Sequence, residues 1–190
     1  PFMSYQTSIE KALGNAGLFV KKSGAGAVKL EGGKEVADTI AAIVNIGIPV
    51  MAHIGLTPQS FHQMSGYKIQ GKSPKAAEKI LSDAIAVEKA GAFAVVLEGI
   101  PSELSKKVTD SVSIPTIGIG AGPHCDGQIQ VFHDILGLFD TFVPKHAKQF
   151  ANISELISSA IKNYKNDVVS GDFPSKSNYV SIDKEILEKS

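Results

Sequence analysis

The sequence contains no arginine and no tryptophan, only one cysteine and no long apolar run. Without arginine, an anionic ligand must be held by lysine, backbone N–H groups or a metal ion, because no guanidinium fork is available. Cys125 cannot form an intrachain disulfide by itself, and a single thiol fits a reducing compartment. No apolar run is long enough to span a bilayer, and no stretch resembles a signal peptide. We therefore expect a cytoplasmic protein.

The composition is that of one ordinary globular domain with a real core: 190 residues, 43% hydrophobic and 20% charged. Nineteen lysines balance nineteen acidic residues. This balance offers no electrostatic basis for binding nucleic acid or an anionic membrane.

Five short apolar runs alternate with helix-like segments along the chain. The runs cover residues 27–30, 49–54, 93–97, 114–119 and 141–143, and helices are predicted over residues 7–22, 34–45, 73–90, 101–112 and 152–166. Nearly continuous apolar strands are typical of a parallel sheet covered by helices. We interpret residues 1–166 as the last five β/α units of a (β/α)8 TIM barrel and residues 167–190 as a C-terminal tail. An open doubly wound sheet is the alternative.

Four ionisable residues lie at the predicted carboxyl ends of strands, where parallel α/β proteins bind ligands: Lys29, Glu31, His53 and Glu98. Lys29 and Glu31 are two apart on one strand, so they project to the same face. The apolar strand before Glu98 would partly desolvate its carboxylate, which favours a base that works near neutral pH.

Each of these residues also has a purely structural interpretation. Lys29 and Glu31 would form a solvated ion pair, and Glu98 would cap the helix that follows. A lone histidine at the position of His53 is more often structural than catalytic. What favours a site is that neighbouring strands end in the same way.

Other motifs carry weaker signals. Gly118, Gly120 and Gly122 follow a strand, but Pro123 stands where a dinucleotide-binding loop needs glycine. The histidines at 62, 124, 133 and 146 lack the spacing of a zinc site, and Cys125 is interpreted as a loop thiol without function. The long loop over residues 55–72 is expected to be functional, with Phe61, Met64 and Tyr67 lining a pocket or packing under the loop.

Several segments together resemble the ketopantoate hydroxymethyltransferase family. They are PFMSY (1–5), VKLEGG (28–33), HIGLTPQS (53–60), GYKIQG (66–71), LE (97–98), IGIGAG (117–122), DGQ (126–128) and GDFP (171–174). The combination of HIGLTPQS with GYKIQG is highly specific, and the resemblance extends to about residue 174.

The resemblance implies a barrel of the phosphoenolpyruvate/pyruvate type, a Mg²⁺ ion and a homodecamer. It implies transfer of a one-carbon unit from 5,10-methylenetetrahydrofolate to 3-methyl-2-oxobutanoate in pantothenate biosynthesis, through a metal-stabilised enolate. By position, Glu98 would be the catalytic base, Lys29 and His53 would bind the keto acid, and Glu31 would belong to the magnesium shell.

The sequence departs from the family pattern at His146, which follows Pro144 and Lys145 where the family has an aromatic residue. The two aspartates that the family uses as direct magnesium ligands would lie upstream of Pro1, so the chain is expected to be a C-terminal fragment. Two other hypotheses stay open: a carbon–carbon lyase or mutase of a related barrel, and a non-catalytic remnant.

Overall fold

The structure is a computed structural model that describes residues 1–60, 66, 68–139 and 142–183. The chain forms two compact units, Pro1–Gln130 and Val131–Ser190. No helix among the described residues is long and apolar enough to cross a membrane. The predicted division at residue 166 stays a prediction.

The first unit contains a parallel sheet of five strands in the order of the sequence: β1 (Val28–Glu31), β2 (Val50–Gly55), β3 (Ala94–Glu98), β4 (Thr116–Ile119) and β5 (Gly127–Gln128). A doubly wound sheet reverses its strand order at a switch point, whereas a β/α barrel adds each strand beside the previous one. The sequential order confirms the prediction of an α/β barrel segment over the open-sheet alternative.

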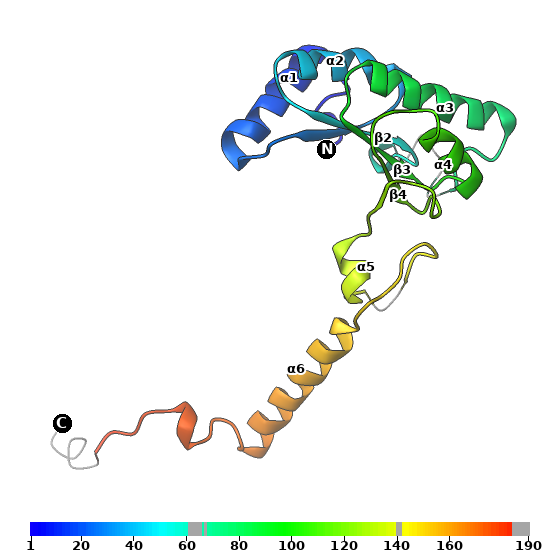
Figure 1. The fold of residues 1–190 in the computed structure, drawn as a ribbon. Coiled ribbons are helices and arrows are strands. Elements are labelled where there is room, and N and C mark those ends of the chain that lie inside the picture. The colour runs from blue at the N-terminus through cyan, green and yellow to red at the C-terminus, as the bar shows by residue number, and fades with distance from the viewer. Residues whose placement is uncertain (61–65, 67, 140–141, 184–190) are drawn as a thin grey trace. The chain divides into compact units, whose positions relative to one another are not determined.

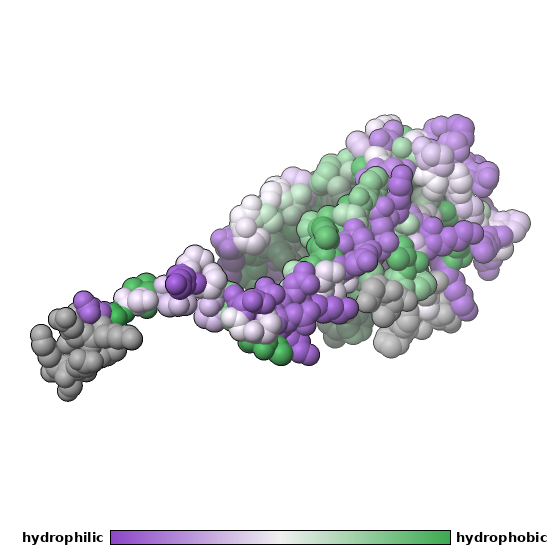
Figure 2. Space-filling model, turned by 90° about the horizontal axis from the view of Figure 1, so that it is seen from below, coloured by the Kyte–Doolittle hydropathy of each residue, from purple (hydrophilic) through white to green (hydrophobic). Residues whose placement is uncertain are grey.

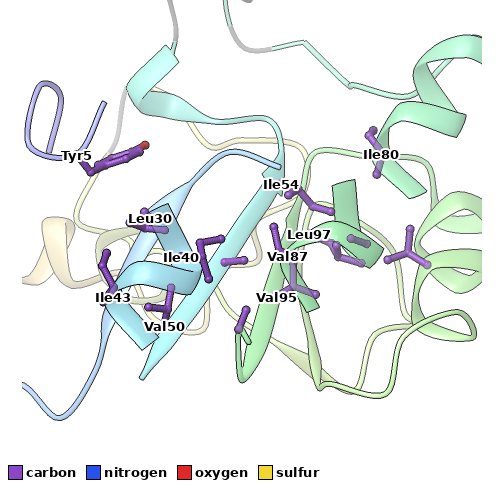
Figure 3. Close-up of a cluster of buried hydrophobic side chains, with 14 of the residues drawn as sticks. Tyr5, Leu30, Ile40, Ile43, Val50, Ile54, Ile80, Val87, Val95 and Leu97 are labelled. Carbon is purple, nitrogen blue, oxygen red and sulfur yellow. The ribbon is translucent and has the colours of Figure 1, made fainter. Parts of the chain in front are cut away.

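One face of the sheet forms the hydrophobic core with the helices (Figures 1 and 3). The helices of this unit are α1 (Ile9–Leu18), α2 (Ala37–Asn45), α3 (Pro74–Lys89) and α4 (Ser102–Thr109). Ile40 and Ile43 of α2 and Val87 of α3 pack with the buried strand residues Leu30, Val50, Ala52, Ile54, Val95 and Leu97. These strand residues alternate with Lys29, Glu31, Met51, His53, Val96 and Glu98, which therefore belong to the opposite face.

Local signals in the sequence account for most helix boundaries. The Ser73 side chain accepts a hydrogen bond from the Ala76 N–H and caps α3, with Pro74 in the first turn as predicted. At the first helix the cap is Ser8, not the predicted Thr7, and Leu18 is followed by the π-helical turn η1 (Phe19–Ser23). The helix predicted from residue 34 begins with the 3-10 turn η2 (Lys34–Val36).

A buried aspartate joins α3 to the loop that follows β1. Asp83 Oδ1 accepts a hydrogen bond from the Lys34 N–H at 3.0 Å, and Lys79 Nζ lies 2.6 Å from Asp83 Oδ2. A Cβ at Gly33 would lie 2.1 Å from Asp83 Cγ. The consecutive glycines after Glu31 therefore allow this loop to pack directly against α3.

The second unit contains the short helix α5 (Phe132–Leu136), the long helix α6 (Ile153–Ser170) and the 3-10 turn η4 (Lys176–Asn178). As predicted, the Asn152 side chain caps α6, by accepting a hydrogen bond from the Glu155 N–H. The prediction of a strand over residues 141–143 is not supported: Phe142 and Val143 are exposed and form no strand, and Thr141 lies outside the described residues. The fifth strand is Gly127–Gln128, which the hydrophobic pattern missed because it is short and polar.

β5 is attached to β4 by Asp126, from the DGQ motif. The Asp126 carboxylate accepts hydrogen bonds from the Thr116 N–H at 2.8 Å and the Thr116 hydroxyl at 3.0 Å. The bond from the Thr116 N–H is the main cause that lowers the pKa of Asp126, and the Thr116 hydroxyl adds to it.

A lowered carboxyl pKa makes this contribution to stability dependent on pH. The contribution is fully present above the ordinary aspartate pKa of about 3.9, and it is lost as the pH falls through the lowered value. We expect wild type to be more stable than Asp126→Asn near neutral pH, and the difference to shrink below about pH 4. Urea unfolding of both proteins across this range measures the difference.

Asp110→Asn is the control, since Asp110 forms an exposed ion pair with Lys106. Such pairs contribute only about 0–1 kcal/mol. A difference in the free energy of unfolding between wild type and Asp126→Asn that stays constant down to the lowest pH would contradict the role given to the Asp126 carboxylate.

Candidate active site

The strand register brings all four predicted site residues to one end of the sheet. Glu31 is the register partner of His53, and Gly55 is the partner of Glu98. Neighbouring residues in register on parallel strands point to the same face, as do residues two apart on one strand. Lys29, Glu31, His53 and Glu98 therefore meet on the face opposite the helices, at the carboxyl ends of β1, β2 and β3.

His53 lies at the centre of this cluster, and its side chain is only 2% exposed. Its Nε2 lies 3.0 Å from Glu98 Oε2, and its Nδ1 lies 3.7 Å from Glu31 Oε1. The side chain of Glu31 is 11% exposed and that of Glu98 is 16% exposed. The site is thus a buried imidazole between two carboxylates that remain accessible to a small ligand.

Lys29 indicates which nitrogen of His53 carries a proton. Lys29 Nζ lies 3.4 Å from His53 Nδ1, and an ammonium group can only donate. In this arrangement Nδ1 accepts, so Nε2 carries the proton and faces Glu98. Although Nε2 is 3.0 Å from Glu98 Oε2, the pair lacks hydrogen-bond alignment, and Nε2 has no hydrogen-bond partner among the described residues. A buried polar atom without a partner is uncommon, and a bound ligand, ion or water molecule is one explanation for it.

Glu31 is held at both its carboxylate and its backbone. The Gln59 N–H donates to Glu31 Oε2 at 2.8 Å. The Tyr5 hydroxyl donates to the Glu31 carbonyl oxygen at 2.8 Å, and the Glu31 N–H lies 3.2 Å from the same hydroxyl. The sequence predictions missed both partners. A signal for Gln59 existed, because Thr-Pro in HIGLTPQS is typical of a tight turn, here the 3-10 turn η3 (Pro58–Ser60).

The backbone of Glu98 is fixed by the loops around it. The Leu56 N–H donates to the Glu98 carbonyl oxygen at 2.8 Å. Gly55 has a φ of 92°, and a Cβ there would lie 2.3 Å from the same oxygen. Only glycine fits this close approach without strain. Gly55 therefore allows the loop after β2 to pack against the end of β3.

Of the glycines at 118, 120 and 122, Gly122 packs directly on α4. A Cβ at Gly122 would lie 2.4 Å from Ser102 Oγ, and the Ser105 hydroxyl donates to the Ala121 carbonyl oxygen at 2.6 Å. The backbone here approaches a helix closely. This geometry gives no support to a dinucleotide site.

The structure shows the surroundings of two other residues singled out from the sequence, Cys125 and His133. Burial is the main cause that raises the pKa of Cys125, so its thiol stays neutral. The His133 ring lies 5.4 Å from that of Phe139, in the second unit. Three further groups of residues lie outside the described part of the chain: Phe61 to Met64 with His62, Tyr67, and residues 184–190.

The described residues do not form a complete magnesium site by themselves. Among them, no group of three or more His, Cys, Asp or Glu side chains could hold a metal ion. Glu31 offers one hard oxygen, Oε1, since Oε2 already accepts from Gln59. Mg²⁺ is commonly bound by one or two carboxylates together with substrate oxygens and water. Glu31 fits as one contributor to such a shell, and the cluster is not a complete site by itself.

The sheet order defines a β/α-barrel type of protein, with four ionisable side chains grouped at its strand ends. Residues 1–176 match the family described as Ketopantoate hydroxymethyltransferase, and the chain belongs to this family.

Curated relatives agree with this assignment, and each is named 3-methyl-2-oxobutanoate hydroxymethyltransferase. The protein of Geobacter metallireducens is 60% identical over 92% of this chain and 65% of its own length. The protein of Dehalococcoides mccartyi is 56% identical over 100% of this chain and 67% of its own length. The protein of Clostridium beijerinckii is 54% identical over 100% of this chain and 69% of its own length. The chain thus spans about two thirds of the length of the relatives it matches.

A pair of glycine substitutions tests the packing that fixes Glu98. Gly55 and Gly47 both have a positive φ, but a Cβ at Gly47 would meet nothing within 4 Å. We expect Gly47→Ala to cost about 1–2 kcal/mol from backbone strain. Gly55→Ala should cost about 1–3 kcal/mol more, because its methyl group collides with the Glu98 carbonyl oxygen. Urea unfolding measures both costs, and equal values would show that this contact does not constrain Glu98.

Proposed function

We propose that this protein is an enzyme that transfers a one-carbon unit from 5,10-methylenetetrahydrofolate to C3 of 3-methyl-2-oxobutanoate, forming 2-dehydropantoate. The observation that carries the proposal is the buried His53–Glu98 pair beside Lys29 and Glu31, in a chain of the ketopantoate hydroxymethyltransferase family. The reaction needs a base, a cation for the keto acid carboxylate and stabilisation of negative charge. The four residues include a group suited to each need.

Glu98 is the proposed base that removes the C3 proton of the keto acid. Its carboxylate is 16% exposed, so it can reach a ligand while the apolar strand β3 limits its hydration. A positioned base accelerates such a proton transfer by about 10²–10⁴-fold. His53 Nε2 lies 3.0 Å from Glu98 Oε2, beside the carboxylate that would take the proton.

Lys29 is the proposed partner of the keto acid carboxylate. It is exposed at the same end of the sheet, and the chain has no arginine for this task. A lysine ammonium supplies a point charge without fixing the plane of the carboxylate. His53 lines the site from β2 and so limits where the keto acid can lie.

A Mg²⁺ ion with Glu31 in its shell is part of the proposal. When bound, the ion would polarise the keto group and stabilise the negative charge that develops on its oxygen. Glu31 is suited to this because the Gln59 N–H and the Tyr5 hydroxyl hold it in place. Ligand residues held by such outer contacts bind metal more tightly.

The overall reaction balances with one water molecule. The keto acid loses its C3 hydrogen and gains a CH₂OH group, with the carbon from the folate and the hydroxyl from water, and tetrahydrofolate is released. Two other functions remain to be separated by experiment. A carbon–carbon lyase or mutase would form product without folate, and a non-catalytic remnant would not bind the keto acid.

Association into a homodecamer in the cytoplasm completes the proposal. Apolar residues are exposed on the protein (Figure 2). On α6 they recur at helical spacing, at Ile157, Ile161, Tyr164 and Val168. Such a row needs a covering surface, which supports association. The single cysteine supports a reducing compartment. Native mass of the purified protein tests the assembly.

Replacing the proposed base should separate binding from chemistry. In Glu98→Gln we expect turnover to fall by at least about 10²-fold, because the amide cannot accept the C3 proton. The side chain keeps its size, so affinity for 3-methyl-2-oxobutanoate should change little. Deuterium exchange at C3 in D₂O, product formation with the folate and calorimetric titration of the keto acid measure the three quantities.

Glu103→Gln is the matched control, since Glu103 lies in the first turn of α4 rather than at a strand end. Its turnover should equal that of wild type. Undiminished C3 exchange in Glu98→Gln would remove Glu98 from the role of base.

A further inference from the structure

The hydroxyl of Tyr5 makes two hydrogen bonds to a single residue that lies 26 positions away in the chain. It donates to the Glu31 carbonyl oxygen at 2.8 Å and accepts from the Glu31 N–H at 3.2 Å. The side chain is 9% exposed and belongs to the hydrophobic core, next to Leu30 (Figure 3). Burial is the main cause that raises the pKa of Tyr5, so the hydroxyl keeps its proton and can donate while it accepts.

These bonds involve backbone groups of Glu31 that do not pair with β2. The Val28 and Gly32 N–H groups donate to carbonyl oxygens of the chain around β2, Pro49 and His53 respectively. Backbone groups alternate in direction along a strand, so the N–H and C=O of Glu31 point away from β2. The Tyr5 hydroxyl satisfies both groups. Together with the Gln59 N–H on the carboxylate, this fixes Glu31 from three directions.

We propose that the Tyr5 hydroxyl is a positioning group for Glu31, which holds that carboxylate at the Lys29–His53–Glu98 cluster and so sets the affinity for the keto acid. The inference rests on the proposed function for its effect on binding, but the positioning itself can be measured independently of any activity. A purely structural alternative exists, in which the Tyr5 ring only fills the core. Tyr5→Phe separates the two, because it keeps the ring and removes the hydroxyl.

The direct readout is hydrogen exchange at single amides. In Tyr5→Phe, the Glu31 N–H loses its acceptor and the Glu31 carbonyl oxygen loses its donor, so the backbone that carries the carboxylate is held less firmly. Exchange at Gln59, whose N–H is bonded to that carboxylate, should then become about 3–10-fold faster. Exchange at Val95, whose N–H donates to Pro115 within the core of the sheet, should stay unchanged. A loss of global stability would accelerate both.

Two further variants serve as controls. Tyr164→Phe removes a hydroxyl from a tyrosine whose ring packs on Phe173, in the other unit, and should leave Gln59 exchange at the wild-type rate. Tyr5→Leu removes both ring and hydroxyl. If the ring alone matters, only Tyr5→Leu will accelerate exchange at Gln59, and Tyr5→Phe will behave like wild type.

Binding completes the test. We expect the dissociation constant for 3-methyl-2-oxobutanoate to rise about 3–10-fold in Tyr5→Phe, by calorimetric titration. Unchanged exchange at Gln59 in Tyr5→Phe would overturn the positioning role, and faster exchange with unchanged affinity would overturn its effect on binding. If wild type itself does not bind the keto acid, the proposed function fails, and exchange at Gln59 still decides whether Tyr5 positions Glu31.

Discussion

The site depends on a histidine that is buried between two carboxylates. Removing an imidazole from water is unfavourable unless its nitrogens find partners. Lys29 lies at Nδ1 of His53, with Glu31 a little further away, whereas Nε2 faces Glu98 without a hydrogen bond among the described residues. The arrangement couples three strands through one side chain. If one strand end shifted, the His53 nitrogen that faces it would lose its charged neighbour. The positions of the strand ends therefore determine the surroundings of the His53 ring.

The strand register and two backbone hydrogen bonds hold the residues around His53 in place. Parallel register places Glu31 beside His53 and Gly55 beside Glu98, where a Cβ would collide with the Glu98 carbonyl oxygen. Hydrogen bonds from Leu56 and Gln59 then fix Glu98 and Glu31 respectively. Both donors come from the HIGLTPQS segment. This segment thus contributes one site residue and the backbone donors that hold two others.

Much of this could be predicted from the sequence, because strand ends and period-two alternation are local signals. The pattern was sufficient to select Lys29, Glu31, His53 and Glu98, and the structure brings these four together. Their individual roles stay predictions. Helix caps such as Ser73 and Asn152 were equally local and are confirmed.

What could not be predicted depends on contacts between distant segments. Nothing near Tyr5 indicates that its hydroxyl bonds to the backbone of Glu31, since the two residues are 26 positions apart and meet only in the folded chain. Hydrophobicity also placed the last strand at residues 141–143, whereas the short polar strand Gly127–Gln128 is held by the bonds between Asp126 and Thr116. In that case polar anchoring, which hydropathy does not detect, decides where the strand forms.

The central claim is that the four ionisable groups form one binding site for a keto acid. A crystal structure of the protein with 3-methyl-2-oxobutanoate tests it most directly. We predict that C3 of the ligand lies roughly 3–3.5 Å from a Glu98 carboxylate oxygen, as expected for proton transfer, with the ligand carboxylate beside Lys29. Keto acid bound elsewhere, with His53, Glu31 and Glu98 unchanged and without ligand contact, would contradict the account.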